Sequence, residues 1–171
     1  TYPDGIKGEP TVQAVRNINP YLADAPNVVL QRRARPLCAE APKMGIGNKP
    51  IDDGEYLFTT EERDAFLQLE PGAAPYFRRW LGADEFLNGY ERWCLWLGDA
   101  EPAALKALPL VMARIAAVRA FRAKSKSAPT QKLAETPRRF HVEFIPESDY
   151  LLIPRVSSER RQFVPIGFIH P

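Results

Sequence analysis

Apolar and polar residues alternate along this 171-residue chain in patterns that predict short strands and helices. Short apolar runs bounded by Gly, Pro or polar residues are typical of strands. Within residues 140–145, the apolar Phe140, Val142 and Phe144 alternate with His141 and Glu143, which indicates a strand with one exposed face. The predicted strands are residues 27–32, 55–58, 92–97, 140–145, 150–153 and 163–169.

Helical signals lie between the predicted strands. Thr59 and Glu62 match a capping box and predict a helix that runs to about Leu69. Residues 73–81 and 130–135 are predicted to form two further short helices. The clearest helical region is residues 101–124, which Pro109 divides into two segments.

Within this longer region, apolar residues follow i, i+3, i+4 spacing and predict the face that packs on the core. Arg122 would fall on the same face in a regular helix, so we expect the helix to bend or end near it. The predicted core-facing residues are Leu108, Val111, Met112, Ile115 and Val118.

This mixture of elements predicts an α+β fold, with a mixed or antiparallel sheet and several flanking helices. Residues 1–26 are rich in Pro, Gly and Asn and are expected to be a lead-in or linker, whereas residues 27–171 are expected to be the folded domain. No apolar run approaches the length of a membrane-spanning helix, so we expect no membrane partner. The two widely separated cysteines favour a reduced, cytoplasmic setting.

Charge is distributed unevenly along the chain. Residues 1–100 hold 11 lysines and arginines against 15 aspartates and glutamates, whereas residues 101–171 hold 12 against 6. The basic bias is strongest over residues 111–139, where eight cations accompany one acid, Glu135. A one-sided basic region is typical of a surface that binds a polyanion, and it also suits docking on an acidic protein surface.

Residues 148–168 carry the sharpest functional signal. Two apolar runs flank a polar segment that contains three arginines, two serines and Glu159. Strand-type sequence on both sides would hold this segment in place, and Arg, Ser and Glu are side chains that contact phosphates or read base edges. The alternative is a solvated hairpin connection with ordinary surface charges.

Catalytic and metal chemistry find little support in the sequence. Cys38 and Cys94 are far apart, and His141 and His170 are the only histidines, so a zinc site is not expected. The triplet at residues 19–21, Asn-Pro-Tyr, resembles part of the catalytic motif of amino-methyltransferases. No glycine-rich donor-binding turn accompanies it, so a plain turn is the favoured interpretation.

Several segments together resemble the target recognition domain of MmeI-like restriction–modification enzymes, the single-chain type IIG/IIL family. The matching segments are NINPYL at Asn17, GNKP at Gly47, GADEFLNGYERWCLWL at Gly82, AVRAFRAKSKSAPTQKLAETP at Ala117 and SDYLLIPRVSSERRQFVPIGF at Ser148. The resemblance implies a domain that recognises a DNA sequence and holds no catalytic centre of its own.

The resemblance also implies the setting of this domain. An adenine-specific methyltransferase domain would precede it and a nuclease domain would lie further toward the N-terminus. S-adenosylmethionine and Mg²⁺ would serve those domains, with no cofactor or metal in this fragment. The implied partners are double-stranded DNA and the methyltransferase domain of the same chain.

Chemistry and resemblance together suggest roles for individual residues. In a strand-like segment, residues two apart point to the same side, so Glu159 and Arg161 are expected to reach one base pair together. Arg suits guanine and Glu accepts from cytosine N4, which matches a G·C pair. The loop at residues 124–130 looks like a second, variable contact region in the resembling proteins, so Ser127 and Ala128 are expected to contact the groove. The residues expected to hold the DNA backbone are Lys124, Lys126, Thr130, Lys132, Arg138, Arg139, Arg155, Ser157, Ser158 and Arg160.

Two other functions remain open at this point. The basic face could dock on acidic surfaces of a larger enzyme, which would make the chain a scaffold without DNA affinity. The chain could also be the recognition domain of a phage-defence DNA methyltransferase.

Overall fold

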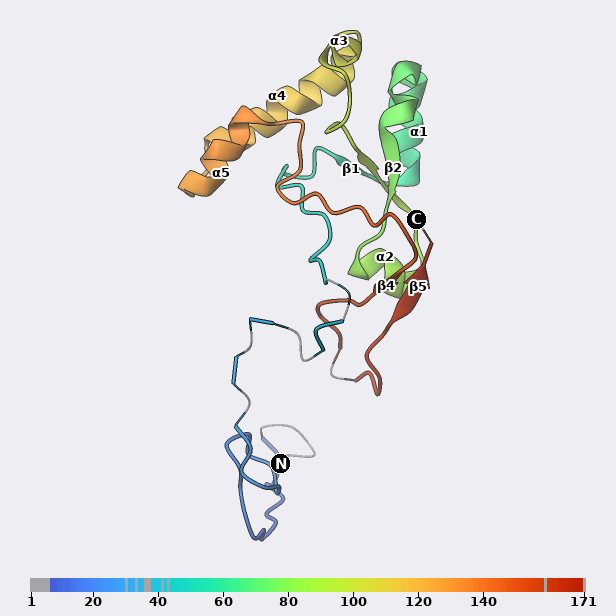
Figure 1. Ribbon diagram of the computed structural model, residues 1–171. Helices are drawn as coiled ribbons and strands as arrows, with labels where there is room; N and C mark the ends of the chain where they lie inside the picture. The colour runs from blue at the N-terminus through green and yellow to red at the C-terminus, as the bar shows by residue number, and fades with distance from the viewer. Residues whose placement is uncertain are drawn as a thin grey trace. The chain divides into compact units, whose positions relative to one another are not determined.

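The computed structural model describes residues 7–29, 31–32, 34–35, 38–40, 42, 44–158 and 160–170. Two compact units divide the chain, residues 1–44 and residues 45–171 (Figure 1). In the first unit, the described residues form turns and extended segments without a helix or strand. The predicted strand at residues 27–32 is therefore wrong for the residues described there. The exposed backbone at Val28 and Val29 has no neighbouring strand among them to complete a ladder.

Asn19 organises a turn in this first unit. Its side-chain Oδ1 accepts hydrogen bonds from the backbone N–H groups of Tyr21, at 2.9 Å, and Ala23, at 3.1 Å. Leu22 adopts the left-handed region, with φ 59°. This is the geometry of an Asx turn, so the interpretation of residues 19–21 as a turn is confirmed.

The second unit is built around a three-stranded antiparallel sheet with the order β1-β3-β2. The strands are β1 (Leu57–Phe58), β2 (Phe77–Trp80) and β3 (Arg92–Leu95). The register pairs Phe58 with Trp93 and Phe77 with Leu95. β3 lies in the centre, as expected for the buried apolar run at residues 92–97.

Helix α1 (Thr60–Leu69) begins at the predicted capping box. Glu62 Oε2 accepts from the Thr59 N–H at 2.8 Å, and Thr59 Oγ1 accepts from the Glu62 N–H at 3.2 Å. The predicted helix at residues 73–81 is wrong, because these residues form the end of the 3₁₀ helix η1 (Pro71–Tyr76) and then β2. Pro75 has no N–H to continue an α-helix, and pairing with β3 extends the residues that follow.

Helices α2 (Ala83–Asn88), α3 (Pro102–Lys106) and α4 (Pro109–Ala123) follow in chain order. Pro109 starts α4 as predicted, since a proline at the first helical position loses no intrahelical hydrogen bond. Four predicted core residues of this region are buried, namely Leu108, Val111, Ile115 and Val118. Met112 is the exception, with 38% of its surface exposed.

Aromatic and aliphatic side chains fill the core between the sheet and the helices. Phe58, Phe66 and Phe77 pack edge to face, with ring centroids 5.1–5.7 Å apart. Leu95, Val111 and Val118 are fully buried, so β3 and α4 supply the centre of the core.

The last third of the chain is mostly irregular. It contains α5 (Ala128–Lys132), the 3₁₀ helix η2 (Leu133–Glu135) and the hairpin β4 (Tyr150–Leu152) and β5 (Gly167–Ile169). The predicted strand at residues 140–145 is wrong: it reduces to a single bridge between Lys49 and Val142. Phe140 is buried and stacks on Tyr56 instead of alternating along a sheet. None of the described helices is long and apolar enough to cross a membrane.

Candidate nucleic-acid interface

The β4–β5 hairpin presents the segment that the sequence singled out. Its strands are antiparallel and pair Tyr150 with Ile169, Leu151 with Phe168 and Leu152 with Gly167. This confirms the two predicted flanking strands, in shorter form. A side chain at Gly167 would collide with the Phe86 ring of α2, so only glycine permits the hairpin to pack this closely.

The connection between β4 and β5 is exposed and turned. Ser158 shapes it, because its Oγ accepts from the Arg160 N–H at 3.2 Å and its carbonyl accepts from the Arg161 N–H at 3.0 Å. This turn, and not a regular strand, is the geometry of the described residues Ser158, Arg160 and Arg161. That Arg161 and Glu159 reach one base pair together stays a prediction. Glu159 itself lies outside the described residues.

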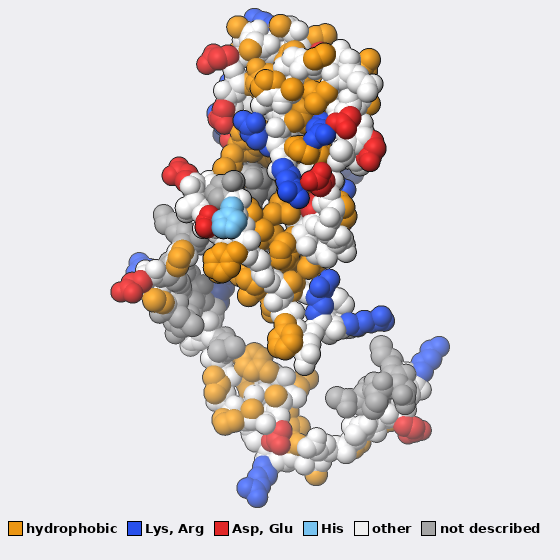
Figure 2. Space-filling view, turned by 90° about the vertical axis from the view of Figure 1, so that its right-hand side faces the viewer, with side chains coloured by type: hydrophobic (Ala, Val, Ile, Leu, Met, Phe, Trp, Pro, Cys, Tyr) orange, Lys and Arg blue, Asp and Glu red, His pale blue; other side chains and the backbone are white. Residues whose placement is uncertain are grey.

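Three arginines of this connection are exposed and have no hydrogen-bond or ion-pair partner among the described residues. Arg155, Arg160 and Arg161 are exposed, and no described residue accepts a hydrogen bond from their guanidinium groups. Apolar side chains accompany them: Val156 is 74% exposed and Phe163 is 78% exposed. Figure 2 shows apolar side chains (orange) exposed among scattered cations (blue) on the face of the molecule that it draws. Ser157 and Ser158 are exposed in the same connection.

A second cationic region lies where α4 turns into α5. The loop is shorter than predicted, since α5 begins at Ala128 and includes Thr130. Ser127 is the N-cap residue, and its N–H donates to Ser125 Oγ at 3.2 Å. Lys124, Lys126 and Lys132 are exposed around this corner. The residues predicted to contact DNA from this second region therefore lie together at the junction of α4 and α5.

Arg122, immediately before this corner, is fully buried. All five of its N–H donors are used by backbone carbonyl oxygens. The acceptors are Ile51 at 2.8 Å, Leu133 at 3.0 Å, Thr136 at 3.1 Å, Pro50 at 2.8 Å and Arg139 at 2.8 Å. Burial lowers the pKa of this guanidinium, yet the set of carbonyls stabilises its charge.

The role of Arg122 corrects the simplest interpretation of the basic stretch. This arginine ties α4 to three other segments and adds no charge to the surface. Helix α4 ends at Ala123, as expected for a helix that ends near Arg122. Its position on the apolar stripe, four residues after Val118, is the sequence signal of a buried structural arginine.

Other cations of residues 111–139 are also engaged within the protein. Arg114 pairs with Glu55 at 2.9 Å and lies over the Phe58 ring. Arg138 donates to the Ala100 carbonyl at 2.6 Å, and Arg139 pairs with Glu143. Both predicted phosphate contacts, Arg138 and Arg139, are therefore held in place before any ligand binds.

The described histidines, cysteines and acids do not gather into a metal site, and one of the two thiols is buried. Among the described residues, no group of three or more His, Cys, Asp or Glu side chains could hold a metal ion. Cys94 is buried, and burial raises the pKa of its thiol to about 12, so it is a poor nucleophile at neutral pH.

Comparisons with known proteins agree with the geometry. The family model for the target recognition domain of MmeI matches residues 24–171. The chain is 38% identical over 157 residues to "DNA methyltransferase A" of Bacillus subtilis (strain 168), covering 92% of this chain and 18% of that protein. A solved structure of the type IIL restriction–modification enzyme MmeI in complex with DNA matches with a TM-score of 0.91 and 50% identity.

That structural match covers 95% of this chain and 22% of the MmeI chain, so the chain spans about a fifth of the length of both relatives. Identity of this level over nearly the whole chain, together with the family match, confirms the resemblance seen in the sequence. The chain belongs to the MmeI target recognition domain family.

Proposed function

We propose that this chain is the sequence-specific DNA-recognition module of a larger DNA methyltransferase. The observation that carries the proposal is the exposed cationic connection between β4 and β5, which is held by paired strands and by the packing of Gly167 on Phe86. A rigidly framed loop of this composition suits the reading of base edges in a groove. The MmeI structure that this chain resembles is a complex with DNA, which supports the same role.

The contacts divide into two kinds. Arg161 and Glu159, with Ser127 and Ala128 at the start of α5, are proposed to read bases. The exposed cations Lys124, Lys126, Lys132, Arg155 and Arg160 are proposed to contact phosphates, since phosphate contacts set position while base contacts set specificity. Ser157, Ser158, Thr130, Arg138 and Arg139 are proposed to support the backbone contacts.

The larger protein is proposed to be a restriction–modification enzyme that methylates adenine and cuts DNA in the cytoplasm. The name of the Bacillus subtilis relative supports the methyltransferase activity, and the MmeI match supports the restriction–modification class. S-adenosylmethionine and Mg²⁺ are proposed to act in other domains of that larger protein. The methyltransferase domain of the same polypeptide is the proposed protein partner.

A selection experiment tests the proposal. The full 171-residue chain is incubated with a library of randomised duplexes, and the bound DNA is sequenced over several rounds at moderate salt. Enrichment of one short motif is expected. If duplexes are retained without an enriched motif, the chain binds DNA non-specifically and the proposed sequence recognition is wrong. If no DNA binds at any salt concentration, a scaffold function is favoured.

A further inference from the structure

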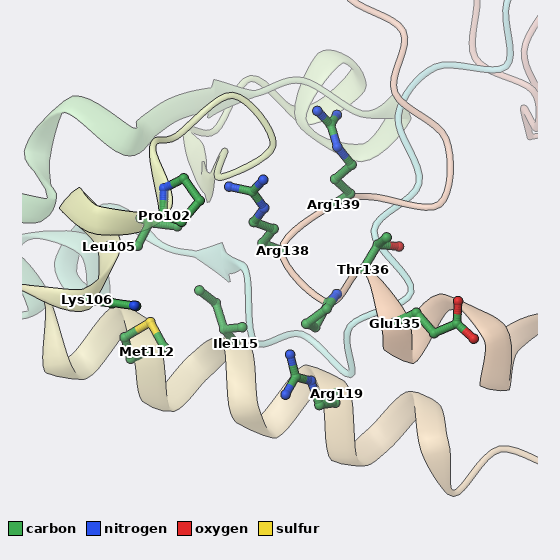
Figure 3. Close-up of a pocket in the computed structure, with 11 residues that line it drawn as sticks. Pro102, Leu105, Lys106, Met112, Ile115, Arg119, Glu135, Thr136, Arg138 and Arg139 are labelled. Atoms are coloured by element: carbon green, nitrogen blue, oxygen red, sulfur yellow. The ribbon is translucent and has the colours of Figure 1, made fainter.

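A cavity of about 390 Å³ lies between helices α3 and α4 and the segment that follows η2. We call it the α3–α4 cleft, and its principal lining residues are Leu105, Lys106, Met112, Arg119, Arg138 and Arg139. Figure 3 shows Lys106, Met112 and Arg119 presented by α3 and α4, with Arg138 and Arg139 on the segment opposite. The cleft thus joins two parts of the chain that are distant in sequence.

The rim of the α3–α4 cleft is strongly cationic. Four cations line it against a single acid, Glu135. Arg138 and Arg139 are already oriented by the Ala100 carbonyl and by Glu143. Lys106 and Arg119 have no acceptor among the described residues. Two fixed and two unengaged cations around one cavity favour an anionic ligand.

The floor of the cleft is apolar. Leu105 and Ile115 are buried beneath it, and the partly exposed Met112 is the one predicted core residue of α4 that the protein does not cover. A ligand that fills this cleft must therefore offer apolar surface between anionic groups.

The backbone of a DNA strand has this alternation, because deoxyribose rings separate its phosphates. Helix α4 also connects the cleft to the exposed Lys124 and Lys126 beyond its C-terminal end. A cationic surface that continues from the cleft to these lysines suits a polyanion better than a single carboxylate. These observations favour a nucleic-acid strand over an acidic peptide.

We propose that the α3–α4 cleft binds the phosphate–deoxyribose backbone of one DNA strand, with Lys106 and Arg119 as phosphate contacts. The inference rests on the proposed DNA-recognition function. It adds a second surface that contacts DNA, separate from the β4–β5 connection. This second surface carries affinity without base discrimination.

The test compares DNA binding by the full 171-residue chain and by the double variant Lys106→Gln/Arg119→Gln. Fluorescence anisotropy of a labelled duplex is recorded across a series of NaCl concentrations. Removing two phosphate contacts is expected to reduce the slope of log K against log[salt] by about 1–2, and to weaken binding about tenfold or more at low salt, with base preference unchanged. Circular dichroism and thermal melting verify that each variant is folded.

The matched control is Arg78→Gln/Arg79→Gln, which removes the same charge from exposed residues of β2 outside the cleft. A smaller effect of this control on slope and affinity supports the cleft. An equal effect of both variants overturns the proposal, because bulk charge would then explain the loss. An unchanged slope in Lys106→Gln/Arg119→Gln also overturns it, because these two cations would then not contact phosphates.

A direct readout accompanies the binding curves. Acetylation of Lys106 by an N-hydroxysuccinimide ester, measured by mass spectrometry, is expected to fall when DNA is bound. Equal acetylation with and without saturating DNA overturns the proposal. If the unmodified chain binds no DNA in either assay, the proposed function itself has failed, which is distinct from failure of the cleft.

Discussion

The carboxylate of Glu70 accepts a hydrogen bond from the backbone N–H of Val111 at 3.0 Å and a second from Leu110 at 2.8 Å. Glu70 ends α1, whereas Leu110 and Val111 lie in the first turn of α4, whose N-cap residue Leu108 has no side-chain oxygen. A residue forty positions away therefore satisfies the free N–H groups of α4 and complements the positive end of its dipole.

Replacing Glu70 by alanine is expected to lower the free energy of unfolding by about 2–3 kcal/mol, because two hydrogen bonds to the carboxylate of a buried residue are lost. Glu70→Gln keeps one acceptor oxygen and is expected to lose less. Urea denaturation followed by circular dichroism measures both. Glu147→Ala, at an exposed glutamate, is the control and is expected to lie within about 0.5 kcal/mol of the unmodified chain. Equal stability of Glu70→Ala and this control would contradict the capping role.

Arg122 gives a second prediction about stability. Arg122→Met leaves five backbone carbonyls without their donor, so the free energy of unfolding is expected to fall by about 3 kcal/mol or more. Arg122→Lys offers three donors in a different geometry and is expected to recover only part of the loss. The measurement is again urea denaturation.

The control for Arg122 is Arg79→Met on β2, where the arginine side chain is 63% exposed. Its effect is expected to be within about 0.5 kcal/mol. If Arg122→Met were as stable as this control, the five hydrogen bonds would not contribute to folding.

Sequence patterns that depend on neighbouring residues predicted the structure well. The Thr59–Glu62 capping box and the break at Pro109 require only local interactions, and both lie where they were expected. The β4–β5 hairpin was also predicted, because its two apolar runs flank a polar connection. The hairpin segment, residues 148–168, was also one of those that carried the resemblance to the family.

Long-range contacts explain what the sequence could not predict. Residues 77–80 became a strand because β3 was available as a partner, and Phe140 turned inward to stack on Tyr56. The cap that Glu70 provides for α4 has no local signature. The α3–α4 cleft was missed because Lys106 and Arg119 meet Arg138 and Arg139 only after η2 folds back.

Alanine variants of Arg161 and Lys126 are expected to change DNA binding in different ways, because the first is proposed to read a base and the second to contact a phosphate. Arg161→Ala is expected to cost about 1–3 kcal/mol on the preferred duplex and to relax discrimination at one base position. Lys126→Ala is expected to weaken binding to all duplexes alike and to reduce the salt slope by about 1. Anisotropy titrations against the selected motif and its single-base variants make the comparison. A uniform loss from Arg161→Ala would reassign that arginine to phosphate contact.

The buried thiol of Cys94 predicts how stability depends on alkaline pH. Its pKa is raised from 9.0 to about 12, chiefly by burial. The unfolded chain releases this proton at lower pH than the folded protein does. The stability that the neutral thiol contributes is therefore fully present below about pH 9 and is lost as the pH rises toward 12.

Cys94→Ala removes this titration while leaving the other alkaline groups in place. The difference in free energy of unfolding between the unmodified chain and Cys94→Ala is therefore expected to shrink as the pH rises above about 9. Urea denaturation at several pH values measures it, with Cys38→Ala, at an exposed thiol, as the control. A difference that stays constant across this range would mean that Cys94 titrates alike in the folded and unfolded chain, which its burial in the centre of β3 argues against.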